Sequence, residues 1–262
     1  METMTMPFIP QVRFEISSLD READLFAYFL QGDRARWHNL LNRVYPELLP
    51  LVAEAKDEAD AHAKCREFAS KLHAWNKDEM ERCLQNLPQE WDKISSDYLR
   101  ALSEHFQTEW PTEHPTIVGY ICVQPVFPRY LDTYSFCVGY KNMPQLIENS
   151  AHEILHFLWF KKWSEVFPEM GPETYGNSHL VWRLSEIIVQ IILQCHPMLH
   201  ELIHPTKWGY SSFAAIKVGD VSMTEYFKRV YEDAVAAHTD FADVMRVLWK
   251  EAQEHEAEIS TF

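Results

Sequence analysis

Two histidines and a glutamate within five residues form the stretch of the sequence best suited to chemistry. His152, Glu153 and His156 stand in the pattern H-E-x-x-H. On an α-helix, residues four apart lie one above the other on the same face, so both imidazoles can bind one metal ion. Glu153 follows directly after the first histidine and can act as a general base on a water at that ion. The pattern therefore predicts a metal centre built on a helix.

The residues around this pattern favour that helix. Asn142 can cap its start, and Pro144 falls in its first turn. Apolar residues recur at helical spacing on both sides of the pattern: Leu146, Ile147, Ile154, Leu155, Leu158 and Trp159. Proline and glycine then accumulate within residues 161–178, where we expect a loop.

Glu186 is the candidate for a third metal ligand. It lies within residues 180–193, which are apolar on nearly every side of a predicted helix, and such a helix is buried. A buried carboxylate is costly unless a cation or strong donors meet it. Two histidines and one glutamate leave a fourth position for water, which is typical of a catalytic zinc site.

With these residues the chain resembles the gluzincin group of zincin metallopeptidases, over about residues 115–195. In that group an H-E-x-x-H helix follows a small sheet, and a glutamate from a second helix completes the metal site. The resemblance implies Zn²⁺ bound by His152, His156 and Glu186. It also implies that Glu153 is the general base in hydrolysis. The resemblance does not specify the substrate, and we expect a peptide or protein. The strand expected at 134–140 could pair with an extended substrate.

Enzymes of this kind usually add a His or Tyr that stabilises the oxyanion. His179 lies seven residues before Glu186, on nearly the same helix face, so we predict it as a second catalytic residue. Some gluzincins have a tyrosine there, and the histidine departs from that pattern. Tyr175 and Tyr210 are the alternatives for this role.

Other interpretations of these residues stay open. The two histidines could be ordinary core residues, with Glu186 paired to Arg183 one turn earlier. A zincin-like scaffold that binds a partner without cutting it would keep every predicted ligand. A second metal could bind His200 and His204, although these residues, with His196, are more typical of a solvated face.

A di-iron carboxylate site is a further alternative. The sequence holds two E-x-x-H pairs, Glu153 with His156 and Glu201 with His204. Pro197 and Pro205 confine the second pair to a segment too short for a long facing helix. The sequence therefore favours a zinc site.

The remaining sequence predicts an α+β, predominantly helical protein: a zincin-like core with a small β-sheet and an N-terminal helical subdomain. We expect subdomains at 1–110 and 111–262. Residues 1–16 read as an extended lead-in, and two strands are expected within 116–127 and 134–140, as a hairpin or as neighbouring edge strands. Expected helices include 53–75, a helix capped by Asp78, 89–108 opened by Pro88, 179–194, one opened by a Ser222–Glu225 capping box, and 240–259.

Composition limits the partners and the compartment. The net charge of −15 and the lack of basic clusters argue against nucleic acid and against an anionic membrane surface. Only 7 glycines are present, and no glycine-rich phosphate loop occurs. The scattered cysteines, odd in number, fit unpaired thiols, although Cys122 and Cys137 could meet across neighbouring strands. With no secretory or membrane-spanning segment recognised, we expect a cytoplasmic protein.

Overall fold

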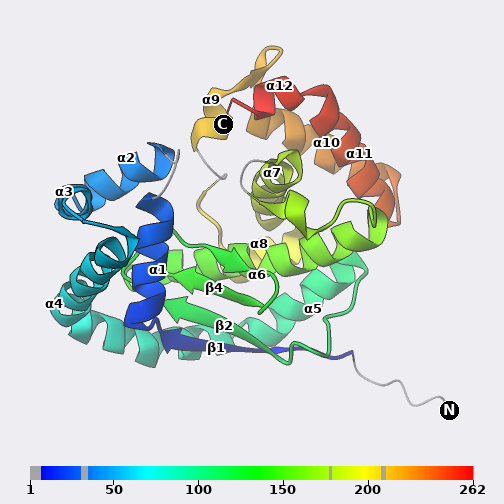
Figure 1. Cartoon of the computed structure of the whole chain (residues 1–262). Helices are drawn as coiled ribbons and strands as arrows, with labels where there is room; N and C mark the ends of the chain where they lie inside the picture. The colour runs from blue at the N-terminus through cyan, green and yellow to red at the C-terminus, as the bar shows by residue number, and fades with distance from the viewer. Residues whose placement is uncertain (1–6, 31–34, 177–178, 208–210, 262) are drawn as a thin grey trace. The chain divides into compact units, whose positions relative to one another are not determined.

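The structure, a computed structural model, describes residues 7–30, 35–176, 179–207 and 211–261. Helices dominate these residues and the strands form two small sheets, which confirms the expected α+β, predominantly helical class (Figure 1). The chain packs as two compact units. The first comprises Met1–Pro10, Ile94–Pro115 and Ala151–Phe262, and the second comprises Gln11–Lys93 and Thr116–Ser150. The sequence-based division at residue 110 stays a prediction.

The second unit contains a four-stranded sheet in the order β1-β2-β4-β3. Three of its strands run parallel to one another: β1 (Gln11–Ile16), β2 (Thr116–Ile121) and β4 (Ser135–Val138). The fourth, β3 (Arg129–Tyr130), runs antiparallel to β4. The two strands expected from the sequence are therefore neighbours, but the expectation of a hairpin or of edge strands is wrong. The connection between β2 and β4 forms β3, which takes one edge of the sheet, and the N-terminal segment supplies β1 at the other.

A glycine allows close packing on this sheet. Gly119 in β2 is paired with Phe14 in β1, and a Cβ atom at position 119 would lie 2.7 Å from the Phe14 ring and 2.9 Å from Phe136. Without that atom, Phe14 and Phe136 pack edge to face, with ring centroids 6.3 Å apart. The sheet therefore gains an aromatic contact that a larger residue at position 119 would block.

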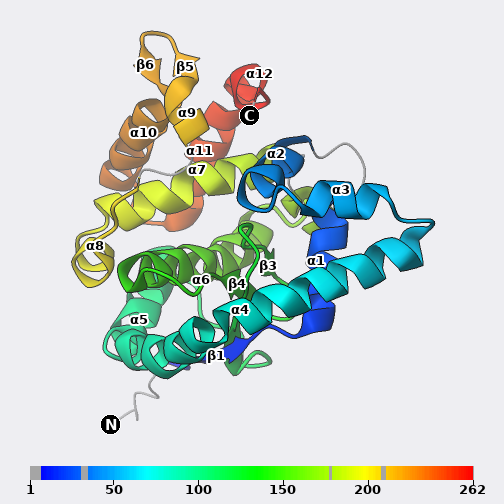
Figure 2. The same ribbon diagram turned by 90° about the vertical axis from the view of Figure 1, so that its left-hand side faces the viewer.

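The helices of the second unit include one that is longer than the sequence predicts. They are α1 (Leu19–Leu30), α2 (Ala35–Val44), α3 (Leu48–Ala53) and α4 (Glu58–Asp92), and α1 lies along α4 (Figure 2). The helix starts expected at Asp78 and Pro88 are wrong, because α4 continues through both positions. Its buried side chains recur every three or four residues past the proline, to Leu87 and Trp91. Their burial offsets the cost of about 3 kcal/mol for a proline inside a helix.

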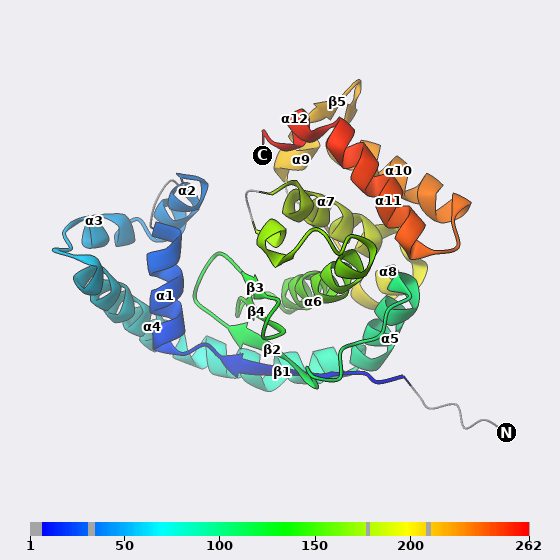
Figure 3. The ribbon, with the colours of Figure 1, turned by 45° about the vertical axis from the view of Figure 1, so that its right-hand side comes forward.

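The first unit is helical and is arranged around α7 (Leu180–Cys195). Helix α7 packs against the 3₁₀ helix η1 and against α8, α10, α11 and α12 (Figure 3). These elements are η1 (Pro172–Tyr175), α8 (Pro197–Ile203), α10 (Met223–Ala237), α11 (Phe241–Glu254) and α12 (Glu256–Ile259). The unit also holds α5 (Ser95–Phe106), α9 (Ser211–Ala215) and the hairpin of β5 (Lys217–Val218) and β6 (Val221–Ser222). Among the described residues, no helix is long and apolar enough to cross a membrane.

Helix α6 (Met143–Val166) carries the H-E-x-x-H pattern and ends later than expected. A loop was expected from residue 161, but the helix continues because Trp163 is fully buried and Lys161 forms an i,i+4 ion pair of 3.0 Å with Glu165. The capping signal at Ser222 is confirmed. The Ser222 hydroxyl accepts the Glu225 N–H at the start of α10, at 3.2 Å. The last expected helix is divided in two at His255, into α11 and α12.

All five cysteines are free thiols, as the sequence predicts. Cys122, just after β2, and Cys137, in β4, are both fully buried. Burial and the adjacent Cys137 side chain hold the pKa of Cys122 well above its usual range. Burial also raises the pKa of Cys65 and Cys83 to about 11. These thiols are therefore protonated near neutral pH and poorly nucleophilic.

A half-buried histidine joins three helices of the first unit. His105 on α5 shares a hydrogen bond of 3.1 Å with the Tyr231 hydroxyl on α10, and its ring lies 4.8 Å from the rings of Phe241 and His196. Burial, and to a smaller extent His196, lower the pKa of His105 from 6.5 to about 3. The imidazole is therefore neutral in the folded chain.

We predict that this histidine makes the fold sensitive to mild acid. Below pH 6.5 the unfolded chain binds a proton at His105 that the folded chain does not, so stability falls with pH until the folded pKa near 3 is reached. By pH 5 the loss amounts to about 2 kcal/mol. Urea unfolding of wild type and His105→Gln at pH 7 and pH 5 should show a smaller pH dependence in the variant. Equal pH dependence in the two proteins would contradict this assignment.

Candidate metal centre

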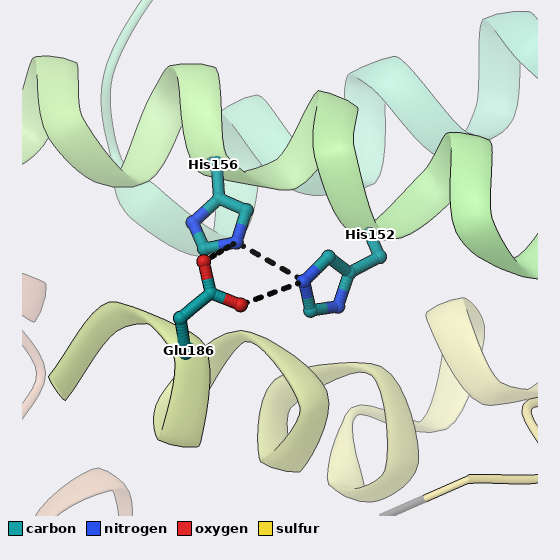
Figure 4. Close-up of side chains that lie close together, drawn as sticks. All are labelled: His152, His156 and Glu186. Carbon is teal, nitrogen blue, oxygen red and sulfur yellow. Dashed lines mark hydrogen bonds and ion pairs between the residues drawn. The ribbon is translucent and has the colours of Figure 1, made fainter. Parts of the chain in front are cut away.

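Helices α6 and α7 bring three metal-binding side chains together. His152 and His156, one turn apart on α6, project toward Glu186 on α7 (Figure 4). The Nε2 atoms of the two histidines are 3.1 Å apart. The Glu186 carboxylate lies 3.4 Å from His152 Nε2 through Oε2 and 3.5 Å from His156 Nε2 through Oε1. Among the described residues, this is the one group of three or more such donors close enough to share a metal ion.

The separations between these atoms fit a tetrahedral zinc site. Zinc binds imidazole nitrogen and carboxylate oxygen at about 2.0–2.1 Å, so two ligands at a tetrahedral angle lie about 3.3 Å apart. The three contacts of 3.1, 3.4 and 3.5 Å are close to that value. Two neutral nitrogens and one carboxylate form a donor set that suits zinc, and they leave a fourth position for water or substrate.

Burial makes this group costly without a positive charge. The Glu186 side chain is 2% exposed and that of His156 is 0% exposed, whereas His152 is 16% exposed. A carboxylate removed from water needs a cation or charged hydrogen-bond donors. The carboxylate and His156 are therefore buried, and His152 is the most exposed of the three side chains.

Gln190 fixes the orientation of His152, and the sequence analysis did not identify it. The Gln190 amide nitrogen donates to the Lys207 carbonyl at 2.6 Å, so its oxygen faces the other way, 3.2 Å from His152 Nδ1. An amide oxygen can only accept, so His152 Nδ1 carries the hydrogen and Nε2 presents its lone pair toward Glu186 and His156. Such a partner on the second ring nitrogen is typical of metal-binding histidines. Its signal in the sequence is an amide side chain one turn after Glu186 in an apolar helix.

The ring of His156 continues into an aromatic stack. Phe160, one turn later on α6, stacks on His156 with an interplanar angle of 19° and a centroid distance of 5.9 Å. Tyr175 in η1 packs on Phe160 at 4.6 Å. The Tyr175 hydroxyl donates to the Met170 carbonyl at 3.2 Å, so this candidate for oxyanion stabilisation is engaged within its own loop.

The other candidate catalytic residues are not part of the group formed by His152, His156 and Glu186. His179 is exposed and caps the N-terminus of α7, two turns from Glu186, which is about 10 Å along the helix axis. Tyr210 lies outside the described residues. Glu153 follows His152 on α6 and is 9% exposed. The catalytic roles of Glu153 and His179 stay predictions.

The structure also bears on the alternative ligand sets. No donor from α8 joins the metal-binding group among the described residues, so Glu201 and His204 do not complete a di-iron site with Glu153 and His156. His196 instead caps α8, where its Nδ1 accepts the Leu199 N–H. The Arg183 guanidinium, considered as a partner for Glu186, donates to the Ile259 carbonyl at 2.9 Å.

In comparisons with known proteins, no family model matches the chain, and no curated protein or solved structure is significantly similar to it. The functional assignment therefore rests on the geometry of His152, His156 and Glu186 and on the hydrogen bonds around them.

We predict one metal ion per chain, bound by these three residues. Replacement of His156 or Glu186 with alanine should weaken zinc binding by more than about 100-fold, since loss of a ligand should exceed the 10- to 100-fold effect of losing a supporting hydrogen bond. The measurement is metal content after purification without added metal, together with zinc titration. His200→Ala, at an exposed position on α8, is the matched control and should bind zinc normally. Normal zinc binding by Glu186→Ala would remove Glu186 from the ligand set.

Proposed function

We propose that the protein is a zinc-dependent hydrolase of the gluzincin type, which cleaves peptide bonds in a peptide or protein substrate. The observation that carries this proposal is the spacing of 3.1–3.5 Å among two imidazole nitrogens and a buried carboxylate. A structural zinc site is closed by four protein ligands, whereas this group supplies three. His152 is the most exposed of the three side chains, so a substrate would approach from its side.

Each of these residues has a separate role in the proposed hydrolysis. When bound, zinc supplies a lower pKa for a coordinated water and polarisation of the substrate carbonyl. His152, His156 and Glu186 hold the ion, and Gln190 keeps His152 in the binding tautomer. Glu153 takes a proton from the attacking water as the new C–O bond forms. It then passes that proton to the amine that leaves when the C–N bond breaks.

The assignment of Glu153 is tested by Glu153→Gln. The amide keeps the size of the side chain but cannot accept the proton, so hydrolysis should fall by about 10²- to 10⁴-fold. Zinc content should stay at one per chain, because Glu153 is not a ligand in this scheme. The measurement is cleavage of a library of unstructured peptides, followed by mass spectrometry of the products.

The control for this variant is Glu169→Gln, an exposed position shortly after α6, which should cleave like wild type. Wild-type protein that holds one zinc but cleaves no peptide would contradict the proposed activity. Zinc loss in Glu153→Gln would instead show that Glu153 belongs to the metal-binding group.

His179→Ala tests the second catalytic residue. If His179 stabilises the oxyanion, its loss should lower kcat by about 10²- to 10³-fold, with zinc retained and with KM little changed. The comparison variant is Tyr175→Phe, which removes a hydroxyl that donates to the Met170 carbonyl. A wild-type kcat in His179→Ala would show that His179 does not stabilise the oxyanion.

A further inference from the structure

A short segment after α8 runs back along α7 and is held there by two glutamines. The return segment (Pro205–Lys207) follows His204, whose left-handed backbone (φ 49°) ends α8. Gln194 donates to the Pro205 carbonyl at 3.0 Å and to the Lys207 carbonyl at 2.6 Å. Gln190, one turn earlier on α7, donates to the same Lys207 carbonyl at 2.6 Å.

These hydrogen bonds continue into the metal-binding group. The Lys207 carbonyl fixes which end of the Gln190 amide faces it, because two oxygens placed together would repel. The Gln190 oxygen is thereby directed at His152 Nδ1, at 3.2 Å. His152 Nε2 is then left as the lone pair that points toward Glu186. One backbone carbonyl in the return segment therefore determines the tautomer of a predicted metal ligand two hydrogen bonds away.

Gln194 takes part in this relay, the hydrogen bonds that lead from the Lys207 carbonyl through Gln190 to His152, by its contact with the Lys207 carbonyl. It contributes the second donor to the Lys207 carbonyl and ties the neighbouring Pro205 carbonyl as well. A carbonyl oxygen has two lone pairs, so it accepts from both glutamines without competition. The position of the carbonyl that orients Gln190 is therefore set by Gln194.

We infer that the return segment controls the metal site: Gln194 and the Lys207 carbonyl set the affinity for zinc by orienting Gln190, and through it His152. Gln194 is thus a positioning residue, and displacement of the return segment would release the metal. This inference rests on the metal centre of the proposed function but not on peptide cleavage.

The relay has a clear signature in zinc affinity. Gln190→Met keeps the length of the side chain and removes both hydrogen bonds, so it should weaken zinc binding by about 10- to 100-fold. Gln194→Met should weaken it by about 2- to 10-fold, the range of a neutral hydrogen bond. Because Gln194 acts through Gln190, the double variant should bind zinc as weakly as Gln190→Met alone.

The experiment is a double-mutant cycle on the full chain, read by zinc titration against a chelator of known affinity. Gln253→Met, an exposed glutamine on α11, is the control and should leave the affinity unchanged. Circular dichroism of each variant confirms folding. Additive effects of the two substitutions, or unchanged affinity in Gln194→Met, would overturn the relay.

A second readout needs neither zinc nor activity. Nitrogen chemical shifts of His152 in the metal-free chain, at a pH where the ring is neutral, distinguish a hydrogen on Nδ1 from one on Nε2. Wild type should carry it on Nδ1, and both glutamine variants should shift toward a mixture of tautomers. An unchanged tautomer in Gln190→Met would overturn the inference even if the protein cleaved peptides. If the glutamine variants change the tautomer and the zinc affinity as expected but the wild-type protein cleaves no peptide, only the proposed function is contradicted.

Discussion

The buried carboxylate of Glu186 is the constraint on which the rest of the first unit depends. It lies on a helix that is apolar around nearly its whole circumference, with a side-chain exposure of 2%. Transfer of an isolated carboxylate into such surroundings costs far more than one hydrogen bond returns, so the fold must provide compensation. The Nε2 atoms of the two imidazoles of α6 lie 3.4 and 3.5 Å from the Glu186 oxygens, close enough for one cation to be shared among the three groups. A divalent cation bound among the three groups would compensate for the buried charge most fully. Zinc bound at the proposed site would therefore also stabilise α7.

Rigid helices position this group more closely than loops could. The rise and twist of α6 alone set His152 and His156 side by side, and packing on α8, α10 and α11 holds α7 in place. The residues least suited to a fixed role lie at the ends of these helices or beyond them. His179 is exposed at the N-terminus of α7, and the Tyr175 hydroxyl is engaged by a carbonyl of its own loop. The metal-binding group is therefore well defined by the fold, whereas the oxyanion-stabilising role is still a prediction.

The sequence predicted the features that depend on local periodicity and missed those set by packing elsewhere. His152, His156 and Glu186 were predicted together because helix spacing and the cost of a buried charge are visible in the residues themselves. The uninterrupted course of α4 was missed, because burial of Leu87 and Trp91 against other elements outweighs the proline between them. The parallel pairing of β2 with β4 was also missed, as was the pairing of β1 with β2, which joins residues as far apart in the chain as Gln11 and Thr116. Gln190 had only a weak signal, because its role depends on a carbonyl in a separate segment.

Gln190 is uncharged, which affects the reactivity expected of a metal ion bound by His152. Two neutral imidazoles and one carboxylate would leave a divalent ion with a net positive charge, and an amide on His152 adds no negative charge to it. A carboxylate in the same place would raise the basicity of the histidine and reduce the pull of the ion on water and carbonyl groups. Structural zinc sites commonly use several thiolates, which neutralise the ion, and no cysteine belongs to the metal-binding group among the described residues. The donor set and its neutral support thus favour an ion that keeps its electrophilic character, which is the property that hydrolysis requires.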